Sequence, residues 1–353
     1  MSIVAIARPE IRALAPYSSA RMEARGGAVL LNANESPWPT TPSVALNRYP
    51  DPQPAELVAL LGALYGVEPG QVLVGRGSDE AIDLLVRAFC RAGQDAIAIC
   101  PPTFGMYAVS ARIQGAAVIE VPLTPQFDLD ADALLVAIAP NVKLVFLCSP
   151  NNPTGGLVPL AAIARIVTAL ANRALVVVDE AYIEFSGSPS ATTLLQQLGN
   201  LAILRTLSKA CALAGARIGA LIGPVDVVAL LRRIQAPYPL PQPCVAAALA
   251  VLSPQAQRDT AGRIETLTGE RERLLVGLCQ LAIVRQVLPS FANFVCVRFV
   301  DAAAVYQRLL RVGIVVRNVS RYPGLGDCLR ITIGTPQENT RLLSALSMCG
   351  AMA

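Results

Sequence analysis

Short apolar runs alternate with helical segments along most of the chain, and this alternation limits the possible folds more than any other feature. The stretch 160–170, for example, carries apolar residues at helical spacing between two such runs. A repeated strand–helix–strand order favours right-handed crossovers and a mainly parallel sheet covered by helices on both faces. We therefore predict an α/β fold whose sheet has seven strands, at 71–74, 96–100, 117–121, 144–148, 174–178, 202–204 and 218–222.

A proline-rich segment, Pro237–Pro243, interrupts the alternation. Proline fixes φ and lacks an amide donor, so such a segment is typical of a boundary between domains. A long helix around 258–278 and strands near 294–299 and 328–333 follow it, which predicts a smaller α+β unit. Because the start of the chain is rich in Pro and Asn, we expect an arm over 1–40, a large domain over 41–243 and a small domain over 244–353.

The composition excludes several classes of protein. Hydrophobic residues form 54% of the 353 residues, which is enough for a large core. The net charge of +4 comes from isolated arginines rather than a basic run, so we expect neither nucleic acid nor a membrane as partner. The amino-terminal apolar stretch is too short for a signal peptide, and no uncharged run approaches the roughly 18 residues of a membrane span. We expect a cytoplasmic protein.

The chain has nine cysteines without a Cys-x-x-Cys pair, and it has no histidine. Cysteines such as Cys90, Cys100, Cys148 and Cys296 fall in or beside apolar runs, which predicts buried free thiols in a reducing compartment. Without histidine, Ser-His, Cys-His and most zinc sites lose their central residue, so we expect no metal. General acid–base chemistry must then use Lys, Tyr, Asp or Glu.

Lys209 is one of only two lysines among the 29 basic residues, and it lies among small and apolar residues. Unlike arginine, a desolvated lysine can lose its proton and form a Schiff base. Lys209 is therefore a candidate covalent catalyst. The alternative is a surface lysine whose stem covers apolar surface, and Lys143, just before the run 144–147, fits that ordinary role.

Three predicted strands end in polar groups. The segment Ser149–Gly155 follows one strand, Asp179–Tyr182 follows the next, and Lys209 comes after a third. Ligands of open α/β sheets bind outside the carboxyl ends of the strands. Each segment alone is weak, because turn pairs and helix caps explain it as well. Together and in this order they resemble the fold-type I pyridoxal-phosphate-dependent aminotransferases.

A glycine-rich turn, Gly75–Glu80, joins a predicted strand to a helix. Exposed backbone N–H groups and the positive end of the helix make such a turn a natural phosphate cradle, although a turn with an Asp cap explains it nearly as well. Arg217, downstream of Lys209, can pair with a phosphate dianion, and Ser208 offers a hydroxyl. A surface arginine is the alternative for Arg217.

Further segments are similar to one family within this class, the histidinol-phosphate aminotransferases. The resemblance spans nearly the whole chain. It departs at Cys211, where these enzymes often carry an aromatic residue, and in the loop Arg317–Arg321, but neither departure removes a catalytic group. The similar segments are Leu31–Pro37, Arg48–Pro52, Cys100–Tyr107, Ala181–Phe185 and Ala236–Leu240.

The resemblance implies a homodimer with a shared active site and a fold-type I architecture, in which a large domain with a mainly parallel seven-stranded sheet carries a smaller α+β domain. It also implies transamination between L-histidinol phosphate and 2-oxoglutarate, which gives imidazole acetol phosphate and L-glutamate in histidine biosynthesis. The cofactor would be pyridoxal 5′-phosphate, with the chemistry on Lys209, Asp179 and Tyr182.

The resemblance also assigns roles to individual residues. Lys209 would hold the cofactor covalently and move protons, and Asp179 would pair with the pyridinium nitrogen. Asn152 and Tyr182 would hydrogen-bond the phenolic oxygen of the ring, and Tyr107 would stack on the ring. The phosphate would be held by Ser78, Asp79, Ser208 and Arg217, with Tyr49 reaching it from the neighbouring subunit.

The substrate site must accept a phosphate monoester in one half-reaction and a carboxylate in the other. The resemblance assigns Arg330 to the carboxylate and Arg317 to the substrate phosphate, with Tyr17 and Asn152 as further contacts. Guanidinium groups suit both anions because they form charge-assisted, bidentate hydrogen bonds. An exposed loop charge is the alternative for Arg317.

Other functions remain open at this stage. Threonine-phosphate decarboxylases and aromatic or broad-range aminotransferases share most of the cofactor contacts and differ in the bond that is cleaved. The same domain serves as the effector module of some DNA-binding regulators, but such a protein needs an appended winged-helix domain. A pseudoenzyme is disfavoured because every cofactor-contacting position is filled.

Overall fold

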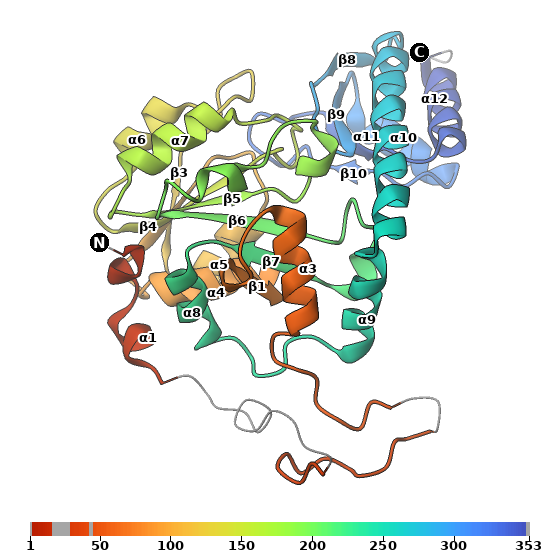
Figure 1. Cartoon of the computed structure of the whole chain (residues 1–353). Coiled ribbons are helices and arrows are strands. Elements are labelled where there is room, and N and C mark those ends of the chain that lie inside the picture. Colours follow the sequence, from red (N-terminus) through yellow and green to blue (C-terminus); the bar gives the residue numbers. More distant parts are fainter. Residues whose placement is uncertain (1, 16–28, 42–44, 351–353) are drawn as a thin grey trace.

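The computed structural model describes residues 2–15, 29–41 and 45–350. A large unit with a central sheet carries the first two thirds of the chain, and a smaller unit lies beside it at the carboxyl-terminal end (Figure 1). The predicted α/β class is confirmed. Among the described residues, no helix is both long and apolar enough to cross a membrane.

The large unit is built on a seven-stranded sheet with the order β1-β7-β6-β5-β4-β2-β3. Neighbouring strands are parallel except at β7, which is antiparallel to both β1 and β6. This confirms the predicted mainly parallel sheet, and each strand lies within a few residues of its predicted position. The strands are β1 (Val72–Gly75), β2 (Ala96–Ile99), β3 (Ala117–Glu120), β4 (Val142–Cys148), β5 (Leu175–Asp179), β6 (Leu201–Thr206) and β7 (Gly219–Ile222).

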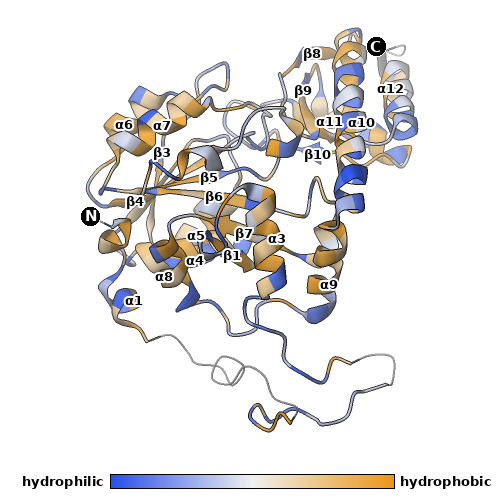
Figure 2. Ribbon diagram, in the orientation of Figure 1, coloured by the Kyte–Doolittle hydropathy of each residue, from blue (hydrophilic) through white to orange (hydrophobic). Residues whose placement is uncertain are grey.

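Helices cover both faces of this sheet, and each face has its own core. Side chains of a strand alternate between faces, so Val176 and Val178 join one core while Leu175 and Val177 join the other. Burial on both faces explains why the strands read as continuous apolar runs (Figure 2). One face is covered by α3 (Ala55–Tyr65), α6 (Ala131–Ala137) and α7 (Leu160–Ala169), and the other by α4 (Ser78–Phe89), α5 (Met106–Gln114) and α8 (Val225–Arg232).

The smaller unit is a four-stranded antiparallel sheet with the order β10-β11-β9-β8. The first two residues of the expected loop Arg317–Arg321 form its edge strand. This unit has a separate core, which includes Leu274, Val297 and Leu346. Its elements are α10 (Pro254–Cys279), β8 (Val284–Val287), β9 (Phe294–Phe299), α11 (Ala302–Arg311), β10 (Arg317–Asn318), β11 (Cys328–Thr332) and α12 (Pro336–Gly350).

The predicted domain limits, after residues 40 and 243, remain predictions. The packing of the neighbouring helices gives information on both. The helix α9 (Gln242–Val251) contributes Val245 and Ala248 to the core of the large unit, which favours a limit between α9 and α10 rather than after residue 243. At the start of the chain, the 3₁₀ helix η1 (Ile3–Ile6) and α1 (Pro9–Ala13) precede the arm, and Ile3 packs into the core beside α8.

The four cysteines expected to be buried, Cys90, Cys100, Cys148 and Cys296, are buried and free. Residues 29–41 and 45–54 run as an extended arm away from the large unit (Figure 1). Several large apolar side chains of this arm are exposed, Leu31 and Trp38 by 88% and 76%.

Candidate active site

A cavity opens at the carboxyl ends of β4, β5 and β6, where the sequence placed its polar strand ends. It brings together eight residues expected to bind a cofactor, Ser78, Asp79, Asn152, Asp179, Tyr182, Ser208, Lys209 and Arg217. Because the ends of parallel strands meet at one edge of a sheet, residues far apart in sequence converge there. The lining is completed by Phe104, Cys148, Ala181 and Thr206.

Lys209 lies just after β6, with its amine 5.8 Å from the centroid of the Tyr182 ring. Burial lowers the pKa of the Lys209 amine, and the positive charges of Arg330 and Arg217 lower it further. Both effects disfavour the protonated amine, which cannot act as a nucleophile. The position therefore suits a lysine that reacts with a carbonyl carbon.

Asp179 ends β5 and is 3% exposed. Its Oδ2 accepts a hydrogen bond from the Tyr107 hydroxyl at 2.7 Å, and its Oδ1 accepts one from the backbone N–H of Ala181 at 3.1 Å. Burial raises the pKa of the carboxyl to about 6, although both hydrogen bonds oppose the shift. Near neutral pH the site thus holds a buried carboxylate that a bound cation would stabilise.

The expectation that Tyr107 stacks on a cofactor ring is wrong. Tyr107 is fully buried on α5, its ring stacks on Phe146 with centroids 4.7 Å apart, and its hydroxyl is directed at Asp179. Phe104, in the loop before α5, lines the cavity instead and meets Tyr107 edge-on. Phe104 therefore supplies an aromatic ring to the cavity lining where Tyr107 was expected, while Tyr107 hydrogen-bonds the Asp179 carboxylate from outside the lining.

Asn152 connects Tyr182 with the smaller unit. Its Nδ2 donates to the Tyr182 hydroxyl at 3.4 Å, and its Oδ1 accepts a hydrogen bond from Arg330 on β11. The Arg330 guanidinium also lies 5.3 Å from the centroid of the Phe294 ring. Burial raises the pKa of Tyr182, so the hydroxyl stays protonated and can donate. Arg330 thus reaches the edge of the cavity from the small sheet.

The start of α4 forms a cradle for an anion. Gly77 caps the helix with φ +82°, and no side chain caps the first N–H groups. Other residues rarely adopt this backbone conformation, and a Cβ at Gly77 would lie 2.7 Å from an Arg217 guanidinium nitrogen. Arg217 is hydrogen-bonded to Ser208 at 3.4 Å and to Asp79 at 3.2 Å. Free N–H groups and a guanidinium thus face one space.

Arg317 lies directly opposite Arg330 in the β10–β11 pair. Residues opposite one another in such a pair project from the same face of the sheet, and like charges there repel. The Arg317 side chain is exposed and forms no ion pair or hydrogen bond within the described part of the chain. An anion bound between the two guanidinium groups would relieve this repulsion.

One expected residue lies elsewhere, and another is not described. Tyr49 is absent from the cavity lining, half exposed, and stacked on Tyr238 with ring centroids 4.4 Å apart. Tyr17 lies outside the described residues. Cys211 is half-buried against the core of the large unit and does not line the cavity. Over the ranges that the structure describes, no group of His, Cys, Asp or Glu is placed to hold a metal.

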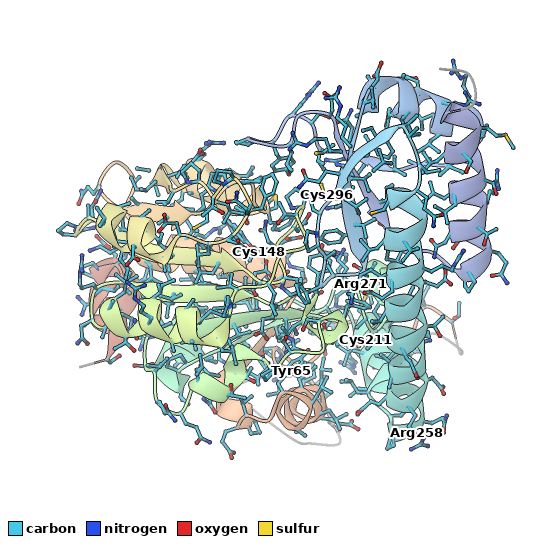
Figure 3. The ribbon with its side chains drawn as sticks, turned by 90° about the horizontal axis from the view of Figure 1, so that it is seen from above. Tyr65, Cys148, Cys211, Arg258, Arg271 and Cys296 are labelled. Atoms are coloured by element: carbon cyan, nitrogen blue, oxygen red, sulfur yellow. The ribbon has the colours of Figure 1, made fainter. Side chains whose placement is uncertain are left out.

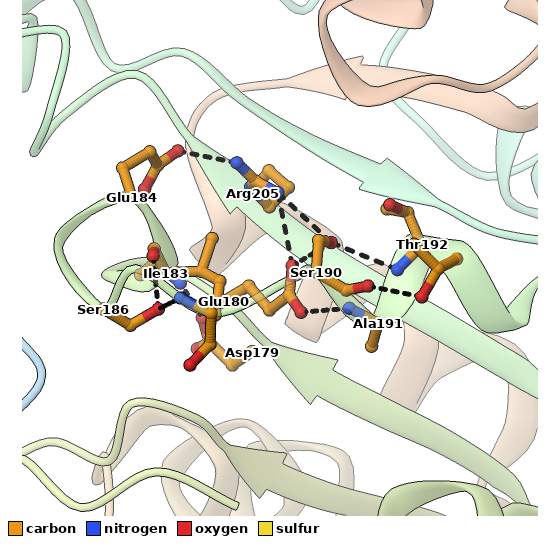
Figure 4. A network of polar contacts seen from close by, with 12 residues as sticks. Asp179, Glu180, Ile183, Glu184, Ser186, Ser190, Ala191, Thr192 and Arg205 are labelled. Atoms are coloured by element: carbon orange, nitrogen blue, oxygen red, sulfur yellow. Dashed lines mark hydrogen bonds and ion pairs between the residues drawn. The ribbon is translucent and has the colours of Figure 1, made fainter. Parts of the chain in front are cut away.

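A buried polar network supports the strand ends from the opposite face (Figure 4). Arg205, next to the cavity residue Thr206, binds Glu180 at 3.2 Å and Glu184 at 2.8 Å, and it covers the Tyr65 ring at 4.5 Å. Glu180 also accepts from the Ser190 hydroxyl and the Ala191 N–H, at 2.5 and 2.6 Å. The residues flanking Tyr182 are thereby tied to β6.

Sequence reasoning missed this network and four of the lining residues, Phe104, Cys148, Ala181 and Thr206. Glu180 and Arg205 each neighbour a cavity residue in a strand, and alternation alone places them on the opposite face, so charged residues at these buried positions were a usable signal. Phe104 and Cys148 gave no signal, because aromatic and apolar residues near strand ends are usually part of the core.

Comparison with known proteins gives one consistent result. Residues 29–346 match the family model for aminotransferases of class I and II. The chain is 54% identical to the histidinol-phosphate aminotransferase of Stenotrophomonas maltophilia, over 99% of this chain and 98% of that protein. It is 55% identical to that of Xanthomonas euvesicatoria pv. vesicatoria, over 98% and 97%.

A solved structure is similar over the same extent. The histidinol-phosphate aminotransferase of Sinorhizobium meliloti, in complex with pyridoxal-5′-phosphate, superposes with a TM-score of 0.77 at 26% identity. The match covers 98% of each chain.

The raised pKa of Asp179 predicts how stability depends on pH in the ligand-free protein. The carboxyl changes from an ordinary 3.8 to about 6 on folding, so the folded protein binds this proton more tightly than the unfolded chain. Its contribution is present below the unfolded pKa and is lost as the pH rises through the folded one. Asp179→Asn should remove this pH-dependent loss of folding stability, which is at most about 3 kcal/mol.

Denaturant unfolding of the wild type and Asp179→Asn at pH 5 and pH 8 measures the difference. The wild type should lose more stability between the two pH values than the variant. An identical pH dependence in both proteins would show that Asp179 is not the buried titrating group.

Proposed function

This chain belongs to the class I and II aminotransferases and, within them, to the histidinol-phosphate aminotransferases; from that membership we infer that it transfers an amino group between L-histidinol phosphate and 2-oxoglutarate. The products are imidazole acetol phosphate and L-glutamate, in a step of histidine biosynthesis. The observation that carries this conclusion is identity of 54% and 55% to such enzymes over nearly the whole chain. The decarboxylase and aromatic aminotransferase alternatives are not favoured.

The residues around the cavity fit pyridoxal 5′-phosphate, the cofactor of this family. The cradle at Gly77 has room and donors for a phosphate, which the N-terminus of a helix stabilises. A carboxylate and an amine of lowered pKa lie in the same cavity. When bound, the cofactor supplies a reactive aldehyde carbon and a ring that withdraws electrons from the substrate α-carbon.

We assign two tasks to Lys209, attachment of the cofactor aldehyde and proton transfer at the substrate α-carbon. Both require the neutral amine, which burial and the charges of Arg330 and Arg217 favour. In a chain without histidine, this amine can serve as a base in the cavity, where it lies beside the carboxylate of Asp179. Once the substrate amine had displaced Lys209 from the aldehyde carbon of the cofactor, the free Nζ of Lys209 would accept the α-proton and return it to that carbon.

Asp179 would hold a proton on the ring nitrogen. A carboxylate stabilises the protonated nitrogen, and the hydrogen bond from Tyr107 keeps the carboxylate oriented. Asn152 and Tyr182 would donate to the phenolic oxygen of the ring, and Phe104 would stack on the ring face. The backbone N–H groups of Ser78 and Asp79, the hydroxyls of Ser78 and Ser208 and the Arg217 guanidinium would donate to the phosphate.

Arg330 would bind the carboxylate or phosphate of either substrate, because it reaches the cavity edge through Asn152. Arg317, its unpaired neighbour across the strand pair, would add a second guanidinium for the phosphate of histidinol phosphate. A phosphate dianion offers more charge and more acceptors than a carboxylate, so the second arginine should matter more for it. Tyr17 is proposed as a further substrate contact on family resemblance alone.

We also propose that the enzyme is a cytoplasmic homodimer with a shared active site. The arm exposes Leu31, Trp38 and Leu46, and exposed apolar side chains grouped on one segment favour a protein interface. Tyr49 lies on this arm with its side chain half exposed, as a residue serving the neighbouring subunit requires. Buried free thiols among the described cysteines favour a reducing compartment.

The attachment of the cofactor to Lys209 can be tested because only two lysines compete. Borohydride reduction of the loaded protein should fix the cofactor on Lys209, and peptide mass spectrometry locates it. Lys209→Ala should lose this adduct and several orders of magnitude in turnover, roughly the effect of removing a covalent catalyst. Lys143→Ala is the control, since Lys143 instead donates to the Pro140 carbonyl at 3.1 Å. An adduct on Lys143, or none, would contradict the assignment.

The roles of the two arginines predict different losses. Arg317→Ala should raise the KM for histidinol phosphate roughly 10- to 150-fold, the value of one charge-assisted hydrogen bond, and the KM for glutamate much less. Arg330→Ala should impair both half-reactions. Arg321→Ala removes an exposed charge from the same loop and serves as the control. An equal rise in KM for both substrates in Arg317→Ala would show that Arg317 does not bind the substrate phosphate.

A further inference from the structure

Arg271 is a buried arginine on α10 that bridges the two units. It is 6% exposed, and its Nη1 donates to the carbonyl oxygen of Phe185 at 3.0 Å and to that of Ala292 at 3.1 Å. Phe185 ends the 3₁₀ helix η3 (Ile183–Phe185) of the large unit, whereas Ala292 precedes β9 in the smaller unit. Figure 3 places Arg271 on α10 at the junction of the two units.

The surroundings of Arg271 contain little compensating charge. Its ion-pair partner is Glu272, whose side chain is 63% exposed and contacts Nε at 3.3 Å. A buried guanidinium is unfavourable unless its donors are hydrogen-bonded, so the two carbonyl contacts are what hold the charge in place. A planar group with fixed donors is suited to holding two backbone segments at a set distance.

Both segments held by Arg271 lead directly to the active site. Tyr182 immediately precedes η3, and Phe294 follows Ala292 by two positions. The Phe294 ring meets the Tyr182 ring edge-on, with centroids 5.2 Å apart, and its centroid lies 5.3 Å from the Arg330 guanidinium carbon. The five residues Tyr182, Phe185, Ala210, Ala292 and Phe294 form one buried cluster.

A second contact fixes the same segment of the smaller unit. The backbone N–H of Phe291 donates to the Gly155 carbonyl at 2.9 Å. A Cβ at Gly155 would lie 2.5 Å from the Ser290 hydroxyl oxygen and 2.9 Å from the Ser290 Cα. The two backbone segments therefore approach each other as closely as glycine allows. The segment before β9 is therefore held from two sides.

We propose that Arg271 is a positioning residue that sets the substrate-anion site of the smaller unit against the cofactor half of the cavity. It does so through Phe294, which lies between Tyr182 and Arg330. The inference rests on the proposed role of Arg330 in anion binding. Without Arg271, Arg330 keeps its charge but loses its fixed place relative to the cavity. Binding of the substrate anion should then weaken while binding of the cofactor is kept.

The test measures the affinity of the holoenzyme for glutarate, a dicarboxylate that cannot react, by isothermal titration calorimetry. Arg271→Met should weaken glutarate roughly tenfold, the lower end for one charge-assisted hydrogen bond, with little change in the dissociation constant of the cofactor. Arg271→Lys keeps the charge and one donor contact and should recover part of the affinity. Arg258→Met, on the same helix but exposed, is the matched control and should bind as the wild type does.

Phe294→Leu keeps the proposal testable if Arg271→Met does not fold, because it removes the ring between Tyr182 and Arg330 and should weaken glutarate in the same way. Unchanged glutarate affinity in the folded variants would overturn the proposal. An equal loss of cofactor and glutarate affinity would do the same, since it indicates a structural role only. Arg330→Lys tests the proposed role of Arg330 by itself. If this variant binds glutarate as the wild type does, Arg330 is not the anion-binding residue, whatever the Arg271 variants show.

Discussion

The buried carboxylate of Asp179 is the charge on which the arrangement of the site depends. Burial makes this charge unfavourable. Hydrogen bonds from the Tyr107 hydroxyl and the Ala181 N–H compensate only in part, since the pKa of Asp179 stays raised to about 6. A cation must complete the site. Lys209 contributes only weakly, since its charge is the smallest of the influences that lower the pKa of Asp179. The geometry leaves the carboxylate available to the protonated ring nitrogen of the cofactor.

The rest of the fold holds the groups around this carboxylate. Parallel pairing brings Asn152, Asp179 and Lys209 to one edge of the sheet, and the Arg205 network ties the ends of β5 and β6 on the opposite face. Arg330, our proposed anion-binding residue, lies on a second sheet with its own core. The two halves therefore need contacts that fix them to each other, and Asn152, Phe294 and Arg271 supply such contacts.

Much of this was accessible from the sequence, for physical reasons. Strands buried on both faces are continuous apolar runs, and polar residues at their ends must converge, so Lys209, Asp179 and Asn152 were found. No periodicity fixes the direction of a side chain in a loop, so the sequence did not show that Phe104, in the loop before α5, lines the cavity and that Tyr107, on α5, does not. From the sequence, Arg271 looks like an ordinary charged residue on a polar helix. Its carbonyl partners, Phe185 and Ala292, are brought to it only by tertiary packing.

Turnover of the Asp179→Asn variant at saturating pyridoxal phosphate tests the central claim most directly. The amide keeps the size of the carboxylate but cannot hold a proton on the ring nitrogen, so removal of the substrate α-proton should slow by several orders of magnitude while the cofactor still binds. Asp83→Asn, a surface carboxylate paired with Arg87 on α4, controls for the loss of charge. Turnover at the wild-type rate in the Asp179 variant would contradict the account.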